Sequence, residues 1–422
     1  MTGRALAQPG FKAFWAGQSL SQLGFQFEGL AMAVLAVQVL HATEAQMGYL
    51  NAATTAAFLL VGLAAGAWVD RWHKRRVMIT ADLVRAVLVS TIPALWFAGV
   101  LTFWHLVVVA GLVGIATVFF DVAYQSYVPL LVHPDAVPDA NGKLESTAQV
   151  ARLGGPAAAG ALLGVVSAPV LLLANAAGFL ASAGTLAVVR DEEAPPPASG
   201  RRPLVTEIRE GLAFVFAQPL LRRVLAATAV SNIGSTVVFT LQPLLVLRIL
   251  GLDPAVLGVV LSLGAIGGLL GSVVAARLGG RLGEGPILRA SLLLAGASSL
   301  LVPASGLFPG AAVGMLVAFS VVFSLAVVVY NVVQVSARQR MCPPRLLGRM
   351  NASIRFVVWG IMPLAALLAG ALGTALGTIP TLWIGAAFNA LSALPFLGRF
   401  GRLRQLPRTP EGVGATAASD EM

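Results

Sequence analysis

Twelve stretches of roughly 20 residues, each predominantly apolar, constrain the fold of this chain more than any other feature. They lie at about residues 13–39, 46–69, 77–99, 104–126, 143–165, 168–189, 220–247, 255–277, 286–305, 308–336, 347–373 and 379–398. Of the 422 residues, 57% are hydrophobic and only 11% are charged, whereas soluble domains carry about 25% charged residues. Because water could not solvate so much apolar surface, the pattern predicts an all-α membrane protein with twelve transmembrane helices.

The one long polar interruption, beginning at Arg190, falls in the middle of the chain. Its proline-rich composition is typical of an extended linker. We therefore predict an N-terminal six-helix bundle (residues 1–190), a cytoplasmic linker (191–218), and a C-terminal six-helix bundle with a cytoplasmic tail (219–422). Pro129 and Asn141 in the first half are echoed by Pro343 and Asn351 in the second, which predicts two pseudo-symmetric bundles with a cavity between them.

The basic residues predict the orientation of the chain in the membrane. With an even number of spans, both termini lie on one side, together with the loop Arg71–Arg76, Lys143, the linker and the tail, whereas the opposite loops contribute only Arg248. By the positive-inside rule that side is the cytoplasm, so we expect a multi-pass protein of the cell (inner) membrane with both termini cytoplasmic. The net charge of +10 is then explained by contacts with membrane lipids, and nucleic acid is not an expected partner.

Polar side chains inside the predicted spans are candidates for the transport pathway, because a charge at the bilayer centre costs at least about 2.5 kcal/mol. The cavity candidates for substrate or protons are Glu28, Asp121, Asn232, Gln242, Asn331 and Gln334. The alternative interpretation is that they form interhelical hydrogen bonds, worth about 0.6 kcal/mol each.

Two further sets of polar residues require an interpretation. Gln18, Gln22 and Gln26 form a stripe on the first span that points well away from Glu28, and we prefer Glu28 as the residue that lines the cavity. A second set is expected nearer the cytoplasmic ends, in gate or boundary ion pairs rather than in substrate contacts; it comprises Asp82, Arg85, Glu145, Arg152 and Arg355.

The loop after the second span carries the most specific motif, which runs from Gly66 through Asp70-Arg71 to Lys74-Arg75-Arg76. It resembles the loop signature of the major facilitator superfamily, with His73 where that family usually has glycine. The resemblance implies a gating loop formed by Gly66, Asp70, Arg71, Arg75 and Arg76, in which Asp70 faces the N-terminus of the eleventh helix near Leu347 and latches the cytoplasmic side. The alternative is that the basic residues of the loop only enforce the topology.

The segment Gly155–Gly160 partly matches the Gly-Pro motif of the fifth helix in drug/proton antiporters, with Ala159 in place of one glycine. Two further stretches, Pro129–Asn141 with Gly154-Gly155-Pro156 and Leu346–Ala352, resemble the branch of this superfamily that contains enterobactin exporters and macrolide efflux pumps. This resemblance implies a secondary active transporter that exports a small amphipathic compound, drug-like or siderophore-like, by alternating access. It also implies an antiporter that exchanges the substrate for protons, for which Glu28 or Asp121 would carry the proton. The fourth span, however, lacks the arginine that many such antiporters carry.

Other classes of function leave no trace in the sequence. Cys342 is the single cysteine, the histidines are scattered, and we expect neither a metal site nor a cofactor. A phosphate-binding loop is missing and the loops are too short for a nucleotide-binding domain, so an ATP-driven pump is not expected. The sequence also contains no apparent His/Asp metal cluster or Ser/His pair, so an enzyme is not expected. The alternatives that stay open are an uncoupled or uptake carrier for a polar metabolite and a lipid-translocating protein. We expect a monomer that acts on a small-molecule substrate.

Overall fold

The computed structural model describes residues 5–69, 71–189, 212–342, 344–398, 401 and 403. The side chains of residues 344–348 and of a few other helical positions lie outside this description. The described residues form helices joined by short connections, with no strand.

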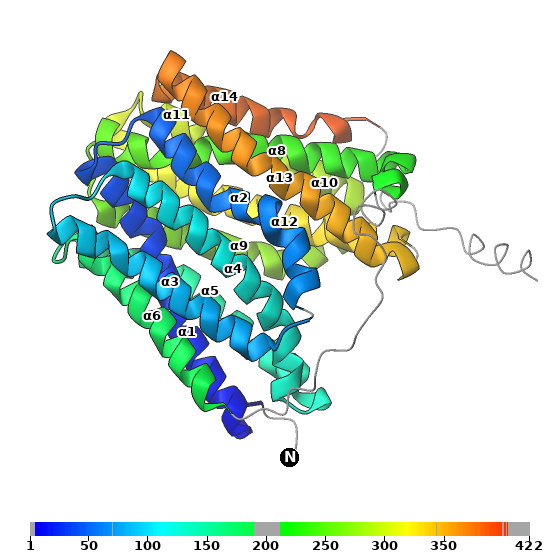
Figure 1. Ribbon diagram of the computed structural model, residues 1–422. Coiled ribbons are helices and arrows are strands. Elements are labelled where there is room, and N and C mark those ends of the chain that lie inside the picture. The colour runs from blue at the N-terminus through cyan, green and yellow to red at the C-terminus, as the bar shows by residue number, and fades with distance from the viewer. Residues whose placement is uncertain are drawn as a thin grey trace, which may run out of the picture.

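The helices form two consecutive sets (Figure 1). The first set contains α1 (Pro9–Val34), extended by the π-helical turn Leu35–Val39, then α2 (Glu44–Val69), α3 (Lys74–Phe97), α4 (Phe103–Leu131), α5 (Val137–Leu163) and α6 (Ala168–Val188). The second set contains α8 (Pro219–Leu244), extended by the π-helical turn Leu245–Ile249, then α9 (Pro254–Leu282), α10 (Glu284–Ser299) with α11 (Leu301–Ser305), α12 (Ala312–Met341), α13 (Pro344–Leu376) and α14 (Thr378–Leu391). Each predicted span coincides with one of these helical columns, so the predicted all-α fold is confirmed.

The lengths of the helices suit a bilayer. In the part of the chain that the structure describes, ten columns are long and apolar enough to cross a membrane. The other two, α2 and α5, have 26 and 27 residues, which span about 40 Å at 1.5 Å per residue. All twelve columns can therefore cross a hydrocarbon core of about 30 Å.

The two sets repeat each other with an offset of 210 residues at four of the six helices. Helix α1 begins at Pro9 and α8 at Pro219, a difference of 219 − 9 = 210 residues, and the same offset relates the starts of α2 and α9, of α3 and α10, and of α6 and α14. His41 and Gly251, also 210 residues apart, both have positive φ angles, of 51° and 62°. The predicted pseudo-symmetry is thus confirmed. The domain boundaries at residues 190 and 219 stay a prediction, because residues 190–211 lie outside the described part.

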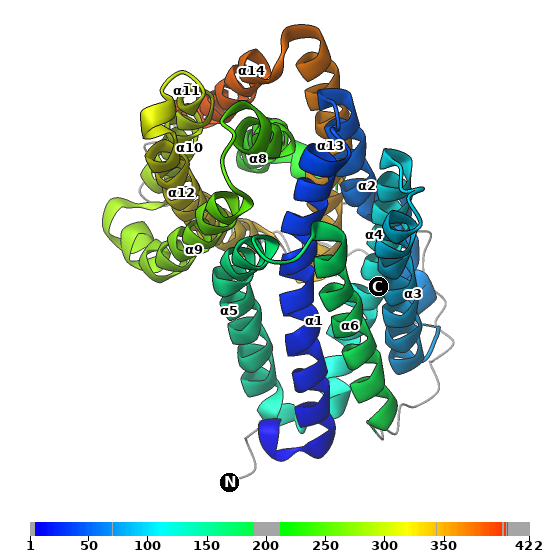
Figure 2. The ribbon, with the colours of Figure 1, turned by 90° about the vertical axis from the view of Figure 1, so that its left-hand side faces the viewer.

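One end of the bundle, where α1 begins and α2 joins α3, carries Arg71 and the residues Lys74–Arg76. We call it the basic end and the other the opposite end. At the opposite end the two sets pack tightly (Figure 2), α2 against α13 and α5 against α9. A Cβ atom on Gly48 of α2 would lie 2.8 Å from Gly370 Cα of α13, so the missing side chain permits this close approach.

The apolar clusters indicate where the two sets separate. At the opposite end a single cluster contains residues of both sets, from Leu35 of the first to Leu245 of the second. At the basic end each set has its own cluster, centred on Phe14 and Tyr127 in the first set and on Leu221 and Ile287 in the second. The two sets are therefore joined at the opposite end and packed independently at the basic end.

Candidate functional site

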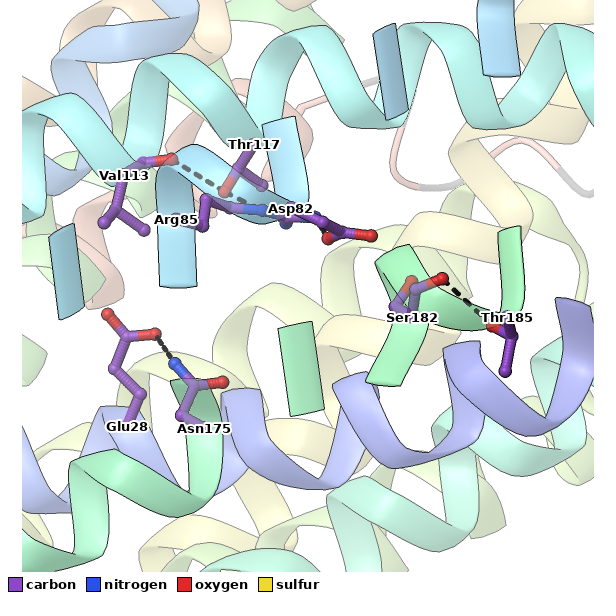
Figure 3. A network of polar contacts seen from close by, with 8 residues as sticks. All are labelled: Glu28, Asp82, Arg85, Val113, Thr117, Asn175, Ser182 and Thr185. Carbon is purple, nitrogen blue, oxygen red and sulfur yellow. Dashed lines mark hydrogen bonds and ion pairs between the residues drawn. The ribbon is translucent and has the colours of Figure 1, made fainter. Parts of the chain in front are cut away.

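A buried arginine lies midway along α3 in a network of polar contacts (Figure 3). Arg85 is eleven residues from the start of α3 at Lys74, which places it about 16 Å along the helix. It forms an ion pair with Asp82, three residues earlier on α3, and the two side chains are 5% and 0% exposed. From the sequence, this pair was expected near the cytoplasmic boundary. The structure corrects that position, because α3 begins at Lys74 and brings both residues into the bundle.

Two aromatic rings lie against the Arg85 guanidinium group. The guanidinium carbon lies 4.3 Å from the ring centroid of Phe120 on α4 and 4.3 Å from that of Phe179 on α6. Its Nη1 group donates a hydrogen bond of 3.4 Å to Thr117 Oγ1 on α4. Cations are attracted to the negative faces of aromatic rings, so the two rings stabilise the buried charge.

Glu28 approaches the same region from α1. Its carboxylate accepts a hydrogen bond of 2.5 Å from Asn175 Nδ2 on α6 (Figure 3). The bond forms because α1 and α6 pack closely: a Cβ atom on Gly24 would lie 2.9 Å from Asn175 Cα, and one on Gly178 would lie 3.0 Å from Leu20 O. Small residues on both helices thus bring Glu28 against α6.

Asp121 occupies a different environment. It is exposed to a cavity of about 390 Å³ that lies between α1, α4 and α5 in the half of the bundle towards the basic end. The polar and charged residues lining the cavity are Gln18, Ser19, Gln22, Asp121, Tyr124, Asn141, Glu145, Thr147 and Arg152. The glutamines of α1 that line this cavity are Gln18 and Gln22. Glu28, which we expected to line it, is not among the lining residues. The physical reason is that the two groups occupy different faces of one helix.

The candidates in the second set have other surroundings. Asn232 on α8 donates a hydrogen bond of 2.9 Å to the backbone oxygen of Val358 on α13, and Gln242 of α8 is buried. On α12, Gln334 is buried and its Nε2 atom lies 3.5 Å from Oδ1 of the exposed Asn331. The bond of Asn232 favours the interhelical alternative for that residue, and the described contacts do not join these four residues to Glu28 or Asp121.

The predicted gating loop is described in part. Asp70 lies outside the described residues, and so does the side chain of Leu347, its predicted counterpart. Arg75 caps α6, since its Nε and Nη2 atoms donate hydrogen bonds of 2.7 Å and 2.5 Å to the oxygens of Leu186 and Ala187. Arg71 and Arg76 are exposed. A Cβ atom on Gly66 would meet nothing within 4 Å, so this conformation gives no packing reason for a glycine there.

The position of Arg85 inside the bundle and the contributions of Asn175 and Phe179 were not predicted from the sequence. A signal for Arg85 was present, because a charge inside an apolar span marks a functional residue by default. Asn175 and Phe179 gave no such signal, since their roles depend on which helix lies against α6. The site is therefore a charged cluster on α1, α3 and α4, completed by polar and aromatic residues of α6.

Comparisons with known proteins match nearly the whole chain. Residues 3–409 match the sequence profile of a family described as transmembrane secretion effector. Macrolide efflux protein A of Streptococcus pyogenes is 24% identical over 380 residues, which cover 87% of this chain and 90% of that protein. Multidrug efflux pump Tap of Mycolicibacterium fortuitum is 27% identical over 360 residues, which cover 82% and 83% of the two chains.

A solved structure agrees on the fold. A bacterial homologue of the iron transporter ferroportin, in an inward-facing state, superposes with a TM-score of 0.75 at 17% identity, covering 93% of this chain and 99% of that one. The family match, the loop motif and the repeated six-helix architecture agree with one another. The chain therefore belongs to the transmembrane secretion effector family of the major facilitator superfamily and is a multi-pass membrane transporter, not an enzyme.

Proposed function

We propose that this protein exports small amphipathic compounds, drug-like or siderophore-like, in exchange for protons. The names of two relatives, a macrolide efflux protein and a multidrug efflux pump, support export. The single observation that carries the proposal is the cavity of about 390 Å³ beside the charged cluster, with Asp121 exposed in its wall. It provides a place for a small molecule next to buried ionisable groups.

The distribution of basic residues supports a location in the cell (inner) membrane. Arg71 and the residues Lys74–Arg76 lie at one end of the helices, and anionic lipid headgroups with the positive-inside bias place such an end in the cytoplasm. In this orientation both termini are cytoplasmic. The protein acts as a monomer, and membrane lipids surround the bundle.

Alternating access is supported by two glycines on one face of α2. Gly48 and Gly66 are 66 − 48 = 18 residues apart, which is about five helical turns, so they face the same direction. A Cβ atom on Gly48 would lie 2.7 Å from Ala366 O of α13, whereas one on Gly66 would meet nothing within 4 Å. The helices diverge towards the basic end, so the central space opens to the cytoplasm. In the outward-open state the bundles of residues 1–190 and 219–422 would close there, and Gly66 would approach α13.

The cavity suits a modest amphipathic molecule. Sites for small molecules usually have volumes of about 300–1,000 Å³, and the value here lies at the lower end. Its wall carries two carboxylates, Asp121 and Glu145, and one guanidinium group, Arg152. When all three are ionised the wall has one net negative charge, which favours a substrate with a cationic group and an apolar body.

The proton pathway is proposed to use Glu28 and Asp121. Glu28 is held by Asn175 between helices, while Asp121 is exposed to the cavity. A proton that neutralises either group removes a charge from within the helical bundle, and this changes the relative stability of the two conformations. Exchange of this proton with the substrate would drive export.

The test is transport of ethidium or of a macrolide into inverted membrane vesicles, with and without a protonophore. The variants are Glu28→Gln and Asp121→Asn, and Asp135→Asn is the matched control because Asp135 is 82% exposed on the short turn Pro134–Ala136. We expect wild-type transport to collapse with the proton gradient, the control to behave like wild type, and at least one of the two variants to lose the dependence on the gradient.

Other results would point to other functions. Transport that persists without the gradient would refute proton coupling and favour an uncoupled carrier. Transport of a polar metabolite in the uptake direction would refute export. Movement of a labelled lipid, with no movement of ethidium or macrolide, would replace the proposal by lipid translocation.

A further inference from the structure

Besides its ion-pair partner Asp82, Arg85 is contacted by residues of two other helices, α6 and α4. On α6, Asn175 and Phe179 are four residues apart and therefore share a face; the first binds Glu28 and the second covers Arg85. On α4, Thr117 and Asp121 are likewise four residues apart. Arg85 thus lies between the face of α6 that holds Glu28 and the face of α4 that carries Thr117 (Figure 3). Asp121 shares the latter face with Thr117.

The two aromatic rings restrict how the guanidinium group can interact. Phe120 and Phe179 each lie 4.3 Å from its central carbon and accept no conventional hydrogen bond, so its N–H donors, which lie in the guanidinium plane, must find acceptors beside the rings. One edge binds Asp82, and Nη1 reaches Thr117. This edge contact points the positive charge towards the face of α4 that carries Asp121.

One guanidinium group serves three carboxylates from three helices. Arg85 is paired with Asp82. Glu28 is held nearby by Asn175, one turn from the Phe179 ring that contacts Arg85, and Asp121 lies one turn from Thr117, which accepts a hydrogen bond from Arg85. When all four groups are ionised the cluster has a net charge of −2, from three carboxylates and one guanidinium group. Around it α4 also contributes Tyr124, α5 contributes Glu145 and Arg152 on the cavity wall, and α6 contributes the neutral Asn175 and Ser182.

We propose that Arg85 is a positioning residue that links the buried Glu28 to the cavity-facing Asp121, so that a proton at Glu28 and a cationic group at Asp121 compete. This inference rests on the proposed proton-coupled export. It assigns different places to the two ligands, since the proton binds between α1 and α6 and the cationic group of the substrate binds in the cavity.

The direction of the effect follows from the charges. A proton on Glu28 leaves the positive charge of Arg85 less compensated, and this charge then repels a cation at Asp121. A cation at Asp121 conversely favours the ionised form of Glu28, and the proton leaves. Coupling between two sites is reciprocal and is usually about 5- to 150-fold in affinity.

The test measures ethidium binding to the purified full-length protein at mildly acidic and mildly alkaline pH, together with proton release on binding. For the wild type we expect the Kd to rise at least about fivefold in acid, with protons released on binding. Glu28→Gln should abolish both effects while binding at alkaline pH is retained. In the double variant Asp82→Asn/Arg85→Gln the buried pair is neutral, and we expect the change in Kd to fall below about twofold, outside the usual range of coupling.

A milder pair of variants tests the same link when the double variant is unstable. Thr117→Val removes the acceptor for Arg85 Nη1, Thr117→Ser restores it, and Thr91→Val on α3 is the matched control, because Thr91 bonds only within its own helix, to Leu88 O. We expect Thr117→Val to reduce the pH dependence of the Kd, Thr117→Ser to recover it, and the control to leave it unchanged. A purely structural role of Thr117 would lower stability without changing the pH dependence.

The outcomes separate this inference from the proposed function. A wild-type Kd that does not depend on pH overturns both. A wild-type Kd that depends on pH, with the same dependence in the double variant and in Thr117→Val, overturns the role of Arg85 and leaves proton-coupled export intact.

Discussion

The two glycines of α2 permit a matched perturbation of the conformational equilibrium. In Gly48→Ala the added methyl group would lie 2.7 Å from Ala366 O and 2.8 Å from Gly370 Cα. Both are backbone atoms, so no side-chain rotation can relieve the contact. In Gly66→Ala the methyl group would meet nothing within 4 Å. The first substitution penalises the conformation described above, and the second does not.

The magnitude follows from the cost of overpacking, about 1–3 kcal/mol for one extra group in a tight contact. Alanine also stabilises helix α2 by about 0.5–1 kcal/mol, but this gain is the same in both conformations and cancels from their equilibrium. We therefore expect Gly48→Ala to shift the population away from the present conformation by about 5- to 150-fold, as 1–3 kcal/mol corresponds to that range. Gly66→Ala should leave the population unchanged or shift it towards this conformation.

Thiol accessibility measures this equilibrium. Gln22→Cys places a reporter in the cavity wall, and Cys342→Ser removes the single native cysteine. The rate of labelling by an impermeant maleimide from the basic side should fall in Gly48→Ala and should not fall in Gly66→Ala. Gly314→Ala is the control, because a Cβ atom there also meets nothing within 4 Å. Equal rates in the two α2 variants would refute the reasoning about the divergence of α2 and α13.

Three further predictions concern stability, each measured by thermal unfolding in detergent. Arg75→Ala removes two hydrogen bonds to the last carbonyls of α6 and should cost about 1–3 kcal/mol, whereas Arg76→Ala, at an exposed position, should stay within about 0.5 kcal/mol. Asn175→Ala leaves Glu28 without its donor and should cost about 1–3 kcal/mol at neutral pH; an equal loss in a Glu28→Gln background would contradict this explanation. Phe179→Leu removes one of two rings from a buried guanidinium group. It should cost about 1–2 kcal/mol more than the loss of buried apolar volume alone. A loss of stability no greater than that caused by the same substitution at another buried phenylalanine of the first set would contradict this explanation.

The sequence by itself determined the elements of this protein, because membrane insertion is decided by local properties. An apolar run of about 20 residues is more stable in the bilayer than in water. Within the bilayer its backbone must form hydrogen bonds inside the segment, so it folds as a helix. The predicted starts at residues 46, 168 and 379 therefore lie within two residues of the helices at Glu44, Ala168 and Thr378. The family motif at Gly66–Arg76 is equally local, since its residues are adjacent in the chain.

Only the tertiary structure decided what the polar residues face. The candidate Glu28 was recognised as an unusual charge, but its partner Asn175 lies 175 − 28 = 147 residues away on α6. Arg85 was placed at the boundary, because its sequence distance from the basic loop is short and nothing local reveals that Phe120 and Phe179 cover it. Side-chain environments depend on which helices pack together and at what rotation, and those contacts join residues that no local pattern connects.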